Sequence, residues 1–484
     1  MADKYDIAII GSGLGGLVCG NILAREGFRV CVLEKEPVLG GCLQTYYRRR
    51  YAIDAGFHYV GCLDEGQILN RYFRFLGLMN KLKIRRLDTD GFDVINIDGR
   101  EFRHAIGHEN FIDTLSRDFP EERANIRKII EKIREIGDLI GADALSKKGG
   151  FATEVLPYFH HSAADFIREN TDNILLQKVL TGSSMLCGGE QETSLAVFSM
   201  VFNSNIESSY RFVDGSQQVI DLLADNIRQN GGEVRNNSEV VKLNVDNEKV
   251  TSAELADGQL IESRYFISNI HPVLTFNILG KTSLVKKSYV SRLNSLKNSG
   301  GFFTLSLMLK TDAFPYLNRN FYYHKGDKKV FFCTSADSGS EQFAKTAQIL
   351  EPMNWSEVAQ WENTKVGRRG ADYLEFKKQR AEKLLEFVSE FQPKLKDTVA
   401  FTSTSTPLTF RDYTGTIHGS AYGIVKDYRN PLLCLVPCKT KLPNLFLTGQ
   451  NNNIHGMLGV FQTALYTCSE LLGQEYLVKK IIDT

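Results

Sequence analysis

A glycine-rich turn near the N-terminus constrains the fold of this chain more than any other feature. Residues 11–16 read Gly-Ser-Gly-Leu-Gly-Gly and lie between a nearly all-apolar run, Tyr5 to Ile10, and a helix-length segment, Leu17 to Glu26. A second apolar run, Arg29 to Leu33, follows after Gly27. Short apolar runs are typical of buried parallel strands, and glycine often ends a helix. The pattern therefore predicts strand, helix, strand, with the glycines at the first turn.

Three glycines and one acidic residue of this unit indicate what it binds. Gly11, Gly13 and Gly16 match the dinucleotide fingerprint, in which the backbone approaches a pyrophosphate at the positive end of a helix. Glu34 ends the second apolar run. A carboxylate at that place accepts hydrogen bonds from ribose hydroxyls and repels a phosphorylated ribose. These residues alone leave both NAD and FAD possible.

The residues that follow Glu34 favour FAD. Gly40 and Gly41, then Thr45, then the stretch Asp54 to His58 (Asp-Ala-Gly-Phe-His) resemble the extended FAD signature of the amine oxidase and phytoene desaturase superfamily. The resemblance implies that the glycine pair lets the chain pass close to the flavin and that the later stretch leads toward the isoalloxazine. From the residues alone, its aspartate could also cap a turn and its histidine fill a polar gap.

The C-terminal part carries a second set of residues similar to this superfamily. Residues 444–450 read Asn-Leu-Phe-Leu-Thr-Gly-Gln, and a helix-length segment from Met457 to Leu472 follows. They resemble the late FAD segment of the superfamily, in which a helix N-terminus faces the flavin pyrimidine and stabilises an anionic reduced flavin. Gln450 stands where many members have an acidic residue. This form is most similar to the retinol saturase branch.

Two shorter stretches support the same branch. Residues 214–217 read Asp-Gly-Ser-Gln, and residues 405–409 read Ser-Thr-Pro-Leu-Thr, with Tyr413 and Tyr422 further on. The resemblance implies that the first stretch opens the return to the FAD domain, where Val240 contacts the adenine through its backbone. It implies that the second lines the flavin and the substrate. An aspartate replaces one glycine in the usual form of the first stretch.

The resemblance therefore implies an FAD cofactor bound by residues from both ends of the chain. No metal is expected, because the close pair Cys434 and Cys438 has no matching second pair. The expected cofactor-binding residues are Gly11, Ser12, Gly13, Leu14, Gly15, Gly16, Glu34, Lys35, Gly40, Gly41, Thr45, His58, Val240, Gly449, Gln450, Gly456, Gly459 and Val460.

The predicted fold is α/β: a Rossmann-type FAD-binding domain with a parallel sheet, interrupted by a mixed α+β substrate domain. A chain of 484 residues is too long for one hydrophobic core. The expected FAD-binding segments are 1–75, 206–273 and 401–484, and the expected substrate-domain segments are 76–205 and 274–400. The clearest further elements are a hairpin around 46–53, helices at 67–86, 120–140, 221–230, 374–391 and 457–472, and strands at 233–245, 264–268, 301–310 and 444–448.

Composition limits the partners and the location. With 58 basic and 57 acidic residues the formal charge is +1, too small a field to gather nucleic acid. Nine scattered cysteines are typical of free thiols in a reducing cytosol. The first residues carry charge and run at once into a strand, unlike a secretory signal. We expect a cytoplasmic protein; the basic helix at 67–86 is a packing helix or a peripheral contact with the inner face of a membrane.

The expected activity is hydride exchange between the flavin and a carbon of an isoprenoid lipid, such as a retinoid or carotenoid, in an apolar tunnel of the substrate domain. The Gln450 form favours saturation over desaturation or cis-trans isomerisation. The nearest proton donors are His455, Tyr422, Tyr413 and His58.

The rival functions are amine or porphyrinogen oxidation and flavin binding without turnover. Because the chain has one dinucleotide fingerprint, no separate NAD(P)H domain is expected. Electrons would then come from a transient partner: NAD(P)H, a quinone or a redox protein.

Overall fold

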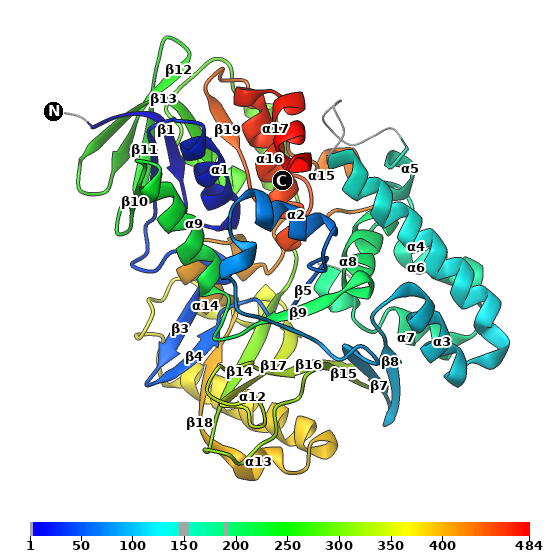
Figure 1. Ribbon diagram of the computed structural model, residues 1–484. Helices are drawn as coiled ribbons and strands as arrows, with labels where there is room; N and C mark the ends of the chain where they lie inside the picture. Colours follow the sequence, from blue (N-terminus) through cyan, green and yellow to red (C-terminus); the bar gives the residue numbers. More distant parts are fainter. Residues whose placement is uncertain (1–2, 145–153, 188–191) are drawn as a thin grey trace.

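A parallel sheet forms the part of the molecule that contains both chain ends (Figure 1). The computed structural model describes residues 3–144, 154–187 and 192–484. The strand order is β10-β2-β1-β13; β19 pairs with the C-terminal part of β13, and the β11–β12 hairpin pairs with its N-terminal part. The strands are β1 (Asp3–Ile10), β2 (Val30–Leu33), β10 (Glu233–Arg235), β11 (Val240–Asp246), β12 (Lys249–Leu255), β13 (Leu260–Ser268) and β19 (Leu445–Leu447).

Helices cover one face of this sheet. Successive side chains of a strand point to opposite faces, so neighbouring residues of β1 pack in different core clusters. Ile7 and Ile9 pack in one core cluster with helix residues such as Leu17 and Phe461, whereas Ala8 and Ile10 pack on the other face. The helices on the first face are α1 (Leu14–Arg25), α2 (Ile68–Phe75), α9 (Gln217–Gln229), α16 (Gly456–Leu472) and α17 (Gln474–Ile482). The predicted α/β fold with a parallel sheet is confirmed.

A second sheet, largely antiparallel, lies at the other end of the molecule (Figure 1). Its order is β18-β14-β17-β16-β15-β7-β8, and β15 and β7 are its parallel pair. The strands are β7 (Asp93–Ile97), β8 (Arg100–His104), β14 (Gly301–Leu309), β15 (Asn320–Lys325), β16 (Lys328–Thr334), β17 (Thr346–Met353) and β18 (Val399–Ser405).

Helices pack on both faces of the second sheet. Tyr322 and Phe331 face a helical layer, and their neighbours Tyr323 and Phe332 face α12 (Ala371–Phe391). The isoleucine stripe predicted at 120–140 lies on α4 and is buried in the helical layer. The layer consists of α3 (His108–Asp118), α4 (Arg123–Ala144), α5 (Leu156–Phe159), α6 (Ala163–Asn170), α7 (Ile174–Leu180) and α8 (Leu195–Glu207).

Smaller elements join the two parts. The expected hairpin is β3 and β4, and a small sheet has the order β5-β9-β6. These strands are β3 (Thr45–Arg48), β4 (Tyr51–Asp54), β5 (Val60–Gly61), β6 (Ile84–Arg86) and β9 (Ser209–Phe212), and the remaining helices are α10 (Pro272–Asn277), α11 (Lys287–Ser295), α13 (Leu395–Thr398), α14 (Pro407–Thr414) and α15 (Pro431–Cys434). Single 3₁₀ turns lie at Gly41–Leu43, Met79–Lys81, Pro120–Glu122, Ser184–Cys187, Trp355–Glu357, Ala359–Trp361 and Ile417–Gly419.

Two predicted elements differ in the structure. The helix expected at 67–86 ends at Phe75, because Gly77 turns the chain with a φ of 70°. A 3₁₀ turn and strand β6 follow, so the basic residues Lys81 and Lys83 do not lie on that helix. The strand expected at 233–245 is two strands, β10 and β11, which pair at different places in the sheet.

The expected domain divisions remain a proposal. The division at 205/206 falls inside α8, and the division at 400/401 falls inside β18, a strand of the second sheet. Among the described helices, none combines the length and the apolar character needed to cross a bilayer.

Candidate active site

A cleft lies at the edge where the parallel strands end. Its volume is about 390 Å³, and it is lined by Gly11 after β1, Glu34 after β2, Asn269 after β13 and Gly449 after β19. Ligands of open α/β sheets bind outside the carboxyl ends of the strands. We call this space the cofactor cleft.

The glycine turn brings the start of α1 against the strands. A Cβ atom on Gly16 would lie 2.3 Å from the carbonyl oxygen of Gly11, so only glycine fits there. Gly13 is the N-cap of α1, no side chain caps that end, and its first turn has no acidic residue. The N–H groups of this helix end are therefore available to an anionic ligand.

Glu34 is held in place by the same turn. Its carboxylate accepts hydrogen bonds from the backbone N–H of Ser12 at 2.9 Å and from the Ser12 hydroxyl at 2.6 Å. The Ser12 hydroxyl in turn accepts the N–H of Gly40 at 3.1 Å. The turn, the acidic residue and the glycine pair thus form one hydrogen-bonded unit beside the cleft.

The C-terminal strand and helix form a further part of the wall, next to the glycine turn: a Cβ atom on Gly15 would lie 3.0 Å from Cα of Gly449. Gly449 has a φ of 100°, and a Cβ atom there would lie 2.6 Å from Oδ1 of Asn269. The buried ammonium of Lys426 donates to the carbonyl oxygens of Cys434, Asn451 and Asn452 at 3.1 to 3.2 Å, which fixes the loop before α16. Burial lowers the pKa of this lysine to about 7.

A flavin nucleotide fits this cleft. The N-terminus of α16 has no side-chain cap and no acidic residue in its first turn, and Gly456 and Met457 of that end line the cleft. Two uncapped helix ends therefore meet one space, one from each end of the chain. The first end suits a pyrophosphate, and the second suits the negative charge of a reduced flavin ring.

Most of the predicted cofactor residues line this cleft, and their contact with FAD stays a prediction. Gly16 and Gly459 act instead in packing, since a Cβ on Gly459 would lie 2.6 Å from the carbonyl oxygen of Ile454. Ser12 orients Glu34. Thr45 and His58 line other cavities. The predicted residues in the cleft wall are Gly11, Gly13, Leu14, Gly15, Glu34, Lys35, Gly40, Gly41, Val240, Gly449, Gln450, Gly456 and Val460.

An apolar cavity adjoins the cofactor cleft on the side of the second sheet. Its volume is about 180 Å³, and its walls include Met200 and Val201 of α8, Phe302 of β14 and Leu350 of β17. The residues that line both spaces are Gly56, Phe57, Ala421, Tyr422, Gly456 and Met457. A molecule in the apolar cavity would therefore lie next to the α16 end of the cofactor cleft.

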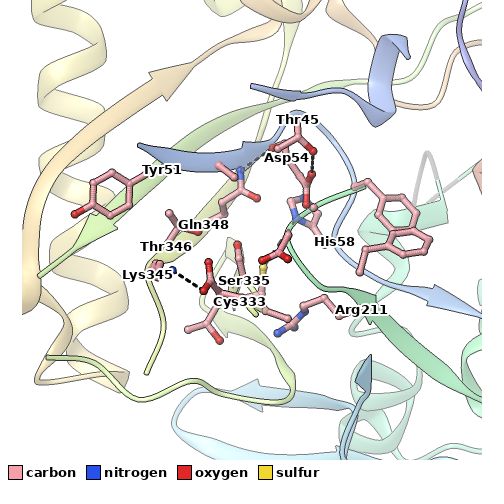
Figure 2. A pocket seen from close by; sticks show the side chains of 18 of the residues that line it. Thr45, Tyr51, Asp54, His58, Arg211, Cys333, Ser335, Lys345, Thr346 and Gln348 are labelled. Atoms are coloured by element: carbon pink, nitrogen blue, oxygen red, sulfur yellow. Dashed lines mark hydrogen bonds and ion pairs between the residues drawn. The ribbon is translucent and has the colours of Figure 1, made fainter. Parts of the chain in front are cut away.

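A separate polar cavity of about 230 Å³ lies between the β3–β4 hairpin and the second sheet (Figure 2). Figure 2 shows Thr45, Asp54 and His58 on one side of it and Arg211 on another. Asp54 accepts hydrogen bonds from the Thr45 hydroxyl at 2.6 Å and from the Ser216 N–H at 2.9 Å. The expected Asp54 motif and the 214–217 stretch thus contact each other and hold the hairpin to the start of α9.

The predicted proton donors occupy different surroundings. Tyr422 lines both the cleft and the apolar cavity, and its ring centre lies 4.8 Å from that of His455. Tyr413 lines the cleft and is 43% exposed. Burial, with the charge of Arg211, lowers the pKa of His58 to about 3, so its ring is neutral near pH 7. Each role stays a prediction; the neutral His58 suits proton donation least.

Four residues in or behind these walls were not predicted from the sequence. Asn269 and Lys426 shape the cofactor cleft, and Tyr59 and Asp93 meet beside the apolar cavity. Asn269 could have been found, since it directly follows a predicted parallel strand. Asp93 also carries a signal, because it is a lone acidic residue in the apolar run from Phe92 to Ile97.

Comparison with known proteins identifies the family. The profile of the family described as flavin containing amine oxidoreductase matches residues 14–472. The chain belongs to this family. Its cofactor is FAD, and it is an FAD-dependent oxidoreductase. The resemblance inferred from the glycine turn and the C-terminal segment is confirmed.

Individual relatives of this flavoprotein agree with the branch that the Gln450 form favoured. It is 24% identical to the all-trans-retinol 13,14-reductase of Rattus norvegicus over 97% of this chain and 86% of that protein. It is 25% identical to a 4,4'-diapophytoene desaturase of a Methylomonas species, over 64% of this chain and 62% of that protein. The crystal structure of an oxidoreductase from Methanosarcina mazei has the same fold, with a TM-score of 0.67 and 14% identity over 96% of this chain and 99% of that one.

Proposed function

We propose that this flavoenzyme adds hydrogen to a carbon-carbon double bond of an isoprenoid polyene of the retinoid or carotenoid kind. The observation that carries the proposal is the apolar cavity that shares a wall with the cofactor cleft at the N-terminus of α16. The near full-length similarity to a retinol 13,14-reductase supports the same substrate class.

The walls of the apolar cavity suit a lipid chain. Met200, Leu350 and Phe302 are apolar, and the Ser204 hydroxyl and the Asn205 side-chain N–H already donate to the Val201 carbonyl oxygen, at 2.7 and 3.2 Å. A polyene therefore buries its surface there without leaving these two donors unpaired. A charged amine would meet few partners in this space.

The chain's own residues orient the substrate and exclude water. Bound FAD supplies or accepts a hydride and so carries the redox chemistry. Tyr422 lies where the two spaces meet. Its position between cofactor and substrate suits it to hold the substrate in place beside the flavin. Lys426 holds the loop before α16, which keeps that helix end directed at the shared wall.

The direction of the reaction and the electron partner belong to the same proposal. The Gln450 form favours saturation, with desaturation or isomerisation on the same scaffold as the alternative. We propose a transient two-electron donor such as NAD(P)H, a quinone or a redox protein, and a lipid substrate drawn from a membrane surface or a carrier.

Anaerobic stopped-flow mixing tests the substrate class. In one arm the reduced enzyme is mixed with a retinoid, a carotenoid or a polyunsaturated fatty acid. In a separate arm the oxidised enzyme is mixed with a primary amine. We expect reoxidation of the flavin by a retinoid or carotenoid and no reduction by the amine. Flavin reduction by the amine alone would overturn the proposal.

A cavity variant links the result to the site. Val201→Phe narrows the apolar cavity and should weaken polyene binding, whereas Val241→Phe adds the same volume at an exposed position of β11. Equal behaviour of the two variants would contradict the assignment of the apolar cavity to the substrate.

A further inference from the structure

A buried carboxyl group lies behind the wall of the apolar cavity. Asp93 of β7 is 1% exposed, and its Oδ2 accepts a hydrogen bond from the Tyr59 hydroxyl at 3.0 Å. Tyr59 is half-buried and lines the apolar cavity. The Tyr59 hydroxyl also lies 2.7 Å from the hydroxyl of the buried Tyr322. One tyrosine therefore connects a buried acid to the proposed substrate space.

The surroundings of Asp93 are polar but nearly uncharged. Its Oδ1 accepts the Asn320 amide at 2.8 Å, and Asn320 in turn accepts from the guanidinium of Arg211 at 2.7 Å. Arg211 is the charged group that acts on Asp93, through Asn320 and not by direct contact. His104 lies opposite Asp93 in the sheet, and burial lowers its pKa to about 3, so it is neutral.

These surroundings make the carboxyl group a proton store at neutral pH. Burial raises the pKa of Asp93 to about 7, and the hydrogen bonds from Asn320 and Tyr59 and the charge of Arg211 only partly oppose this. Burial, with the neighbouring Asp93 charge, raises the pKa of Tyr59. Tyr59 alone is therefore a weak acid. It can give up its proton only when another group supplies a second proton to its oxygen.

The hydrogen bond between Asp93 and Tyr59 allows Asp93 to supply that second proton. When Asp93 is ionised, the Tyr59 hydroxyl must donate to it, because a carboxylate only accepts. When Asp93 is protonated, its O–H donates to the Tyr59 oxygen, and Asp93 no longer holds the Tyr59 proton, for which a bound substrate then competes with the Tyr322 hydroxyl at 2.7 Å. The charge on Asp93 thus controls whether the Tyr59 proton is held by Asp93 or is available to another acceptor.

We propose that Tyr59 is the proton donor of the double-bond reduction and that Asp93 resupplies its proton. The inference rests on the proposed function. Tyr59 is the catalytic residue, since it lines the substrate space, and Asp93 is a positioning residue that acts through Tyr59.

The proposed step balances. The π bond of the double bond breaks and two C–H bonds form: one carbon receives a hydride from reduced flavin, and its neighbour receives the Tyr59 proton. The Asp93 proton passes to the Tyr59 oxygen, and solvent reprotonates Asp93. Reduced flavin is the reductant, and no charge is left on the product.

Infrared difference spectra of the FAD-loaded protein without substrate provide the first test. Most carboxyl groups titrate near pH 4, so a protonated-carboxyl band lost at about pH 7 stands apart. We expect this band in the wild type and its absence in Asp93→Asn. In Tyr59→Phe its midpoint should move upward, because the ionised form loses a hydrogen-bond donor.

Single-turnover reoxidation by the active polyene provides the second test. Protonated Asp93 is required, so the wild-type rate should fall as pH rises through about 7. Tyr59→Phe should lower the rate by about 10²- to 10⁴-fold with unchanged substrate affinity. Asp93→Asn should lower the rate and remove its dependence on pH near 7.

Tyr323→Phe is the matched control. Tyr323 is a buried tyrosine of β15, next to Tyr322. It faces the opposite side of the sheet, where its hydroxyl accepts a hydrogen bond from Gln392. It should leave both the infrared titration and the rate as in the wild type.

The outcomes separate this inference from the proposed function. Wild-type reoxidation rates in Tyr59→Phe, or a band near pH 7 that persists in Asp93→Asn, would overturn the donor assignment while the polyene reduction stands. Failure of every polyene to reoxidise the wild type would overturn the proposed function and the catalytic role of Tyr59 together. The infrared titration would then still decide whether Asp93 holds a proton at neutral pH.

Discussion

The cofactor cleft and the apolar cavity adjoin each other but are built in different ways. The cleft is formed by main-chain turns and helix ends at the edge of a parallel sheet, with Gly16 and Gly449 at positions where a Cβ atom would meet neighbouring atoms at under 3 Å. The apolar cavity is formed by side chains of α8, β14 and β17 and of the segments around Tyr59 and Tyr422. One wall depends on backbone geometry, and the other depends on the chemistry of individual side chains.

This difference separates what is fixed from what can vary. Backbone N–H groups and helix ends recognise a pyrophosphate and a flavin whatever the substrate is. Under the proposed function, side chains such as Val201 and Leu350 determine which molecule fits beside the flavin. The comparison therefore predicts that changes in the wall of the cofactor cleft alter FAD affinity, whereas changes in the wall of the apolar cavity alter substrate binding and reaction rate.

Gly16→Ala should have the largest effect on FAD binding. The new Cβ would lie 2.3 Å from the Gly11 carbonyl oxygen and 3.2 Å from Cβ of Asn269, so the turn must open. We expect FAD affinity to fall by more than about tenfold, which corresponds to roughly 1.4 kcal/mol. Flavin absorbance per protein and titration of the apoprotein with FAD measure this.

The control for this change is Gly141→Ala. Gly141 lies in α4, and a Cβ there meets no atom within 4 Å. The change should stabilise the protein by about 0.5 to 1 kcal/mol and leave FAD binding unchanged. If both variants kept the same flavin content, the backbone geometry at the glycine turn would not determine FAD binding.

The sequence predicted the backbone wall well for a local reason. The strand, the glycine turn, Glu34 and the closing helix are each signalled by neighbouring residues, and the C-terminal anchor by a short motif. Asn269 was missed, although it directly follows a predicted strand; its role depends on Gly11 and Gly449, which are distant in the chain.

The side-chain wall could not be predicted in the same way. The second sheet places β7 between β8 and β15, which pairs residues near 95 with residues near 322. That pairing places Asp93 beside β15, where Tyr59, which lies outside this sheet, contacts both Asp93 and Tyr322. The helix predicted at 67–86 was wrong for a related reason, since the segment after Gly77 forms β6 beside the distant strand β9.

Asp93 should make the stability of the protein depend on pH. Burial raises its pKa from 3.8 to about 7, so between these values the folded protein holds a proton that the unfolded chain has lost. The free energy of unfolding therefore falls as pH rises through this window. The contribution between about pH 5 and about pH 8 is about 3 kcal/mol.

Urea unfolding of the wild type and Asp93→Asn at these two pH values measures this contribution. The variant should lose less stability on raising the pH, by about that amount. FAD affinity should be the same in the wild type and in Asp93→Asn at each of the two pH values, because the main-chain N–H groups that face the pyrophosphate do not depend on the charge of Asp93. A variant with the wild-type slope would show that Asp93 is ionised at low pH in the folded protein.

Asn173→Ala should have the smallest effect and tests whether the two regions are independent. Asn173 caps α7: its Oδ1 accepts the N–H groups of Leu175 and Leu176, each at 3.1 Å. Loss of the cap should cost about 1 kcal/mol of stability, and Asn173→Ser, which keeps an acceptor, should cost only a few tenths. Because α7 packs on the second sheet away from the cofactor cleft, FAD affinity should stay constant in both variants. A parallel loss of flavin would mean that the helical layer supports the cleft, and the separation of the two walls would fail.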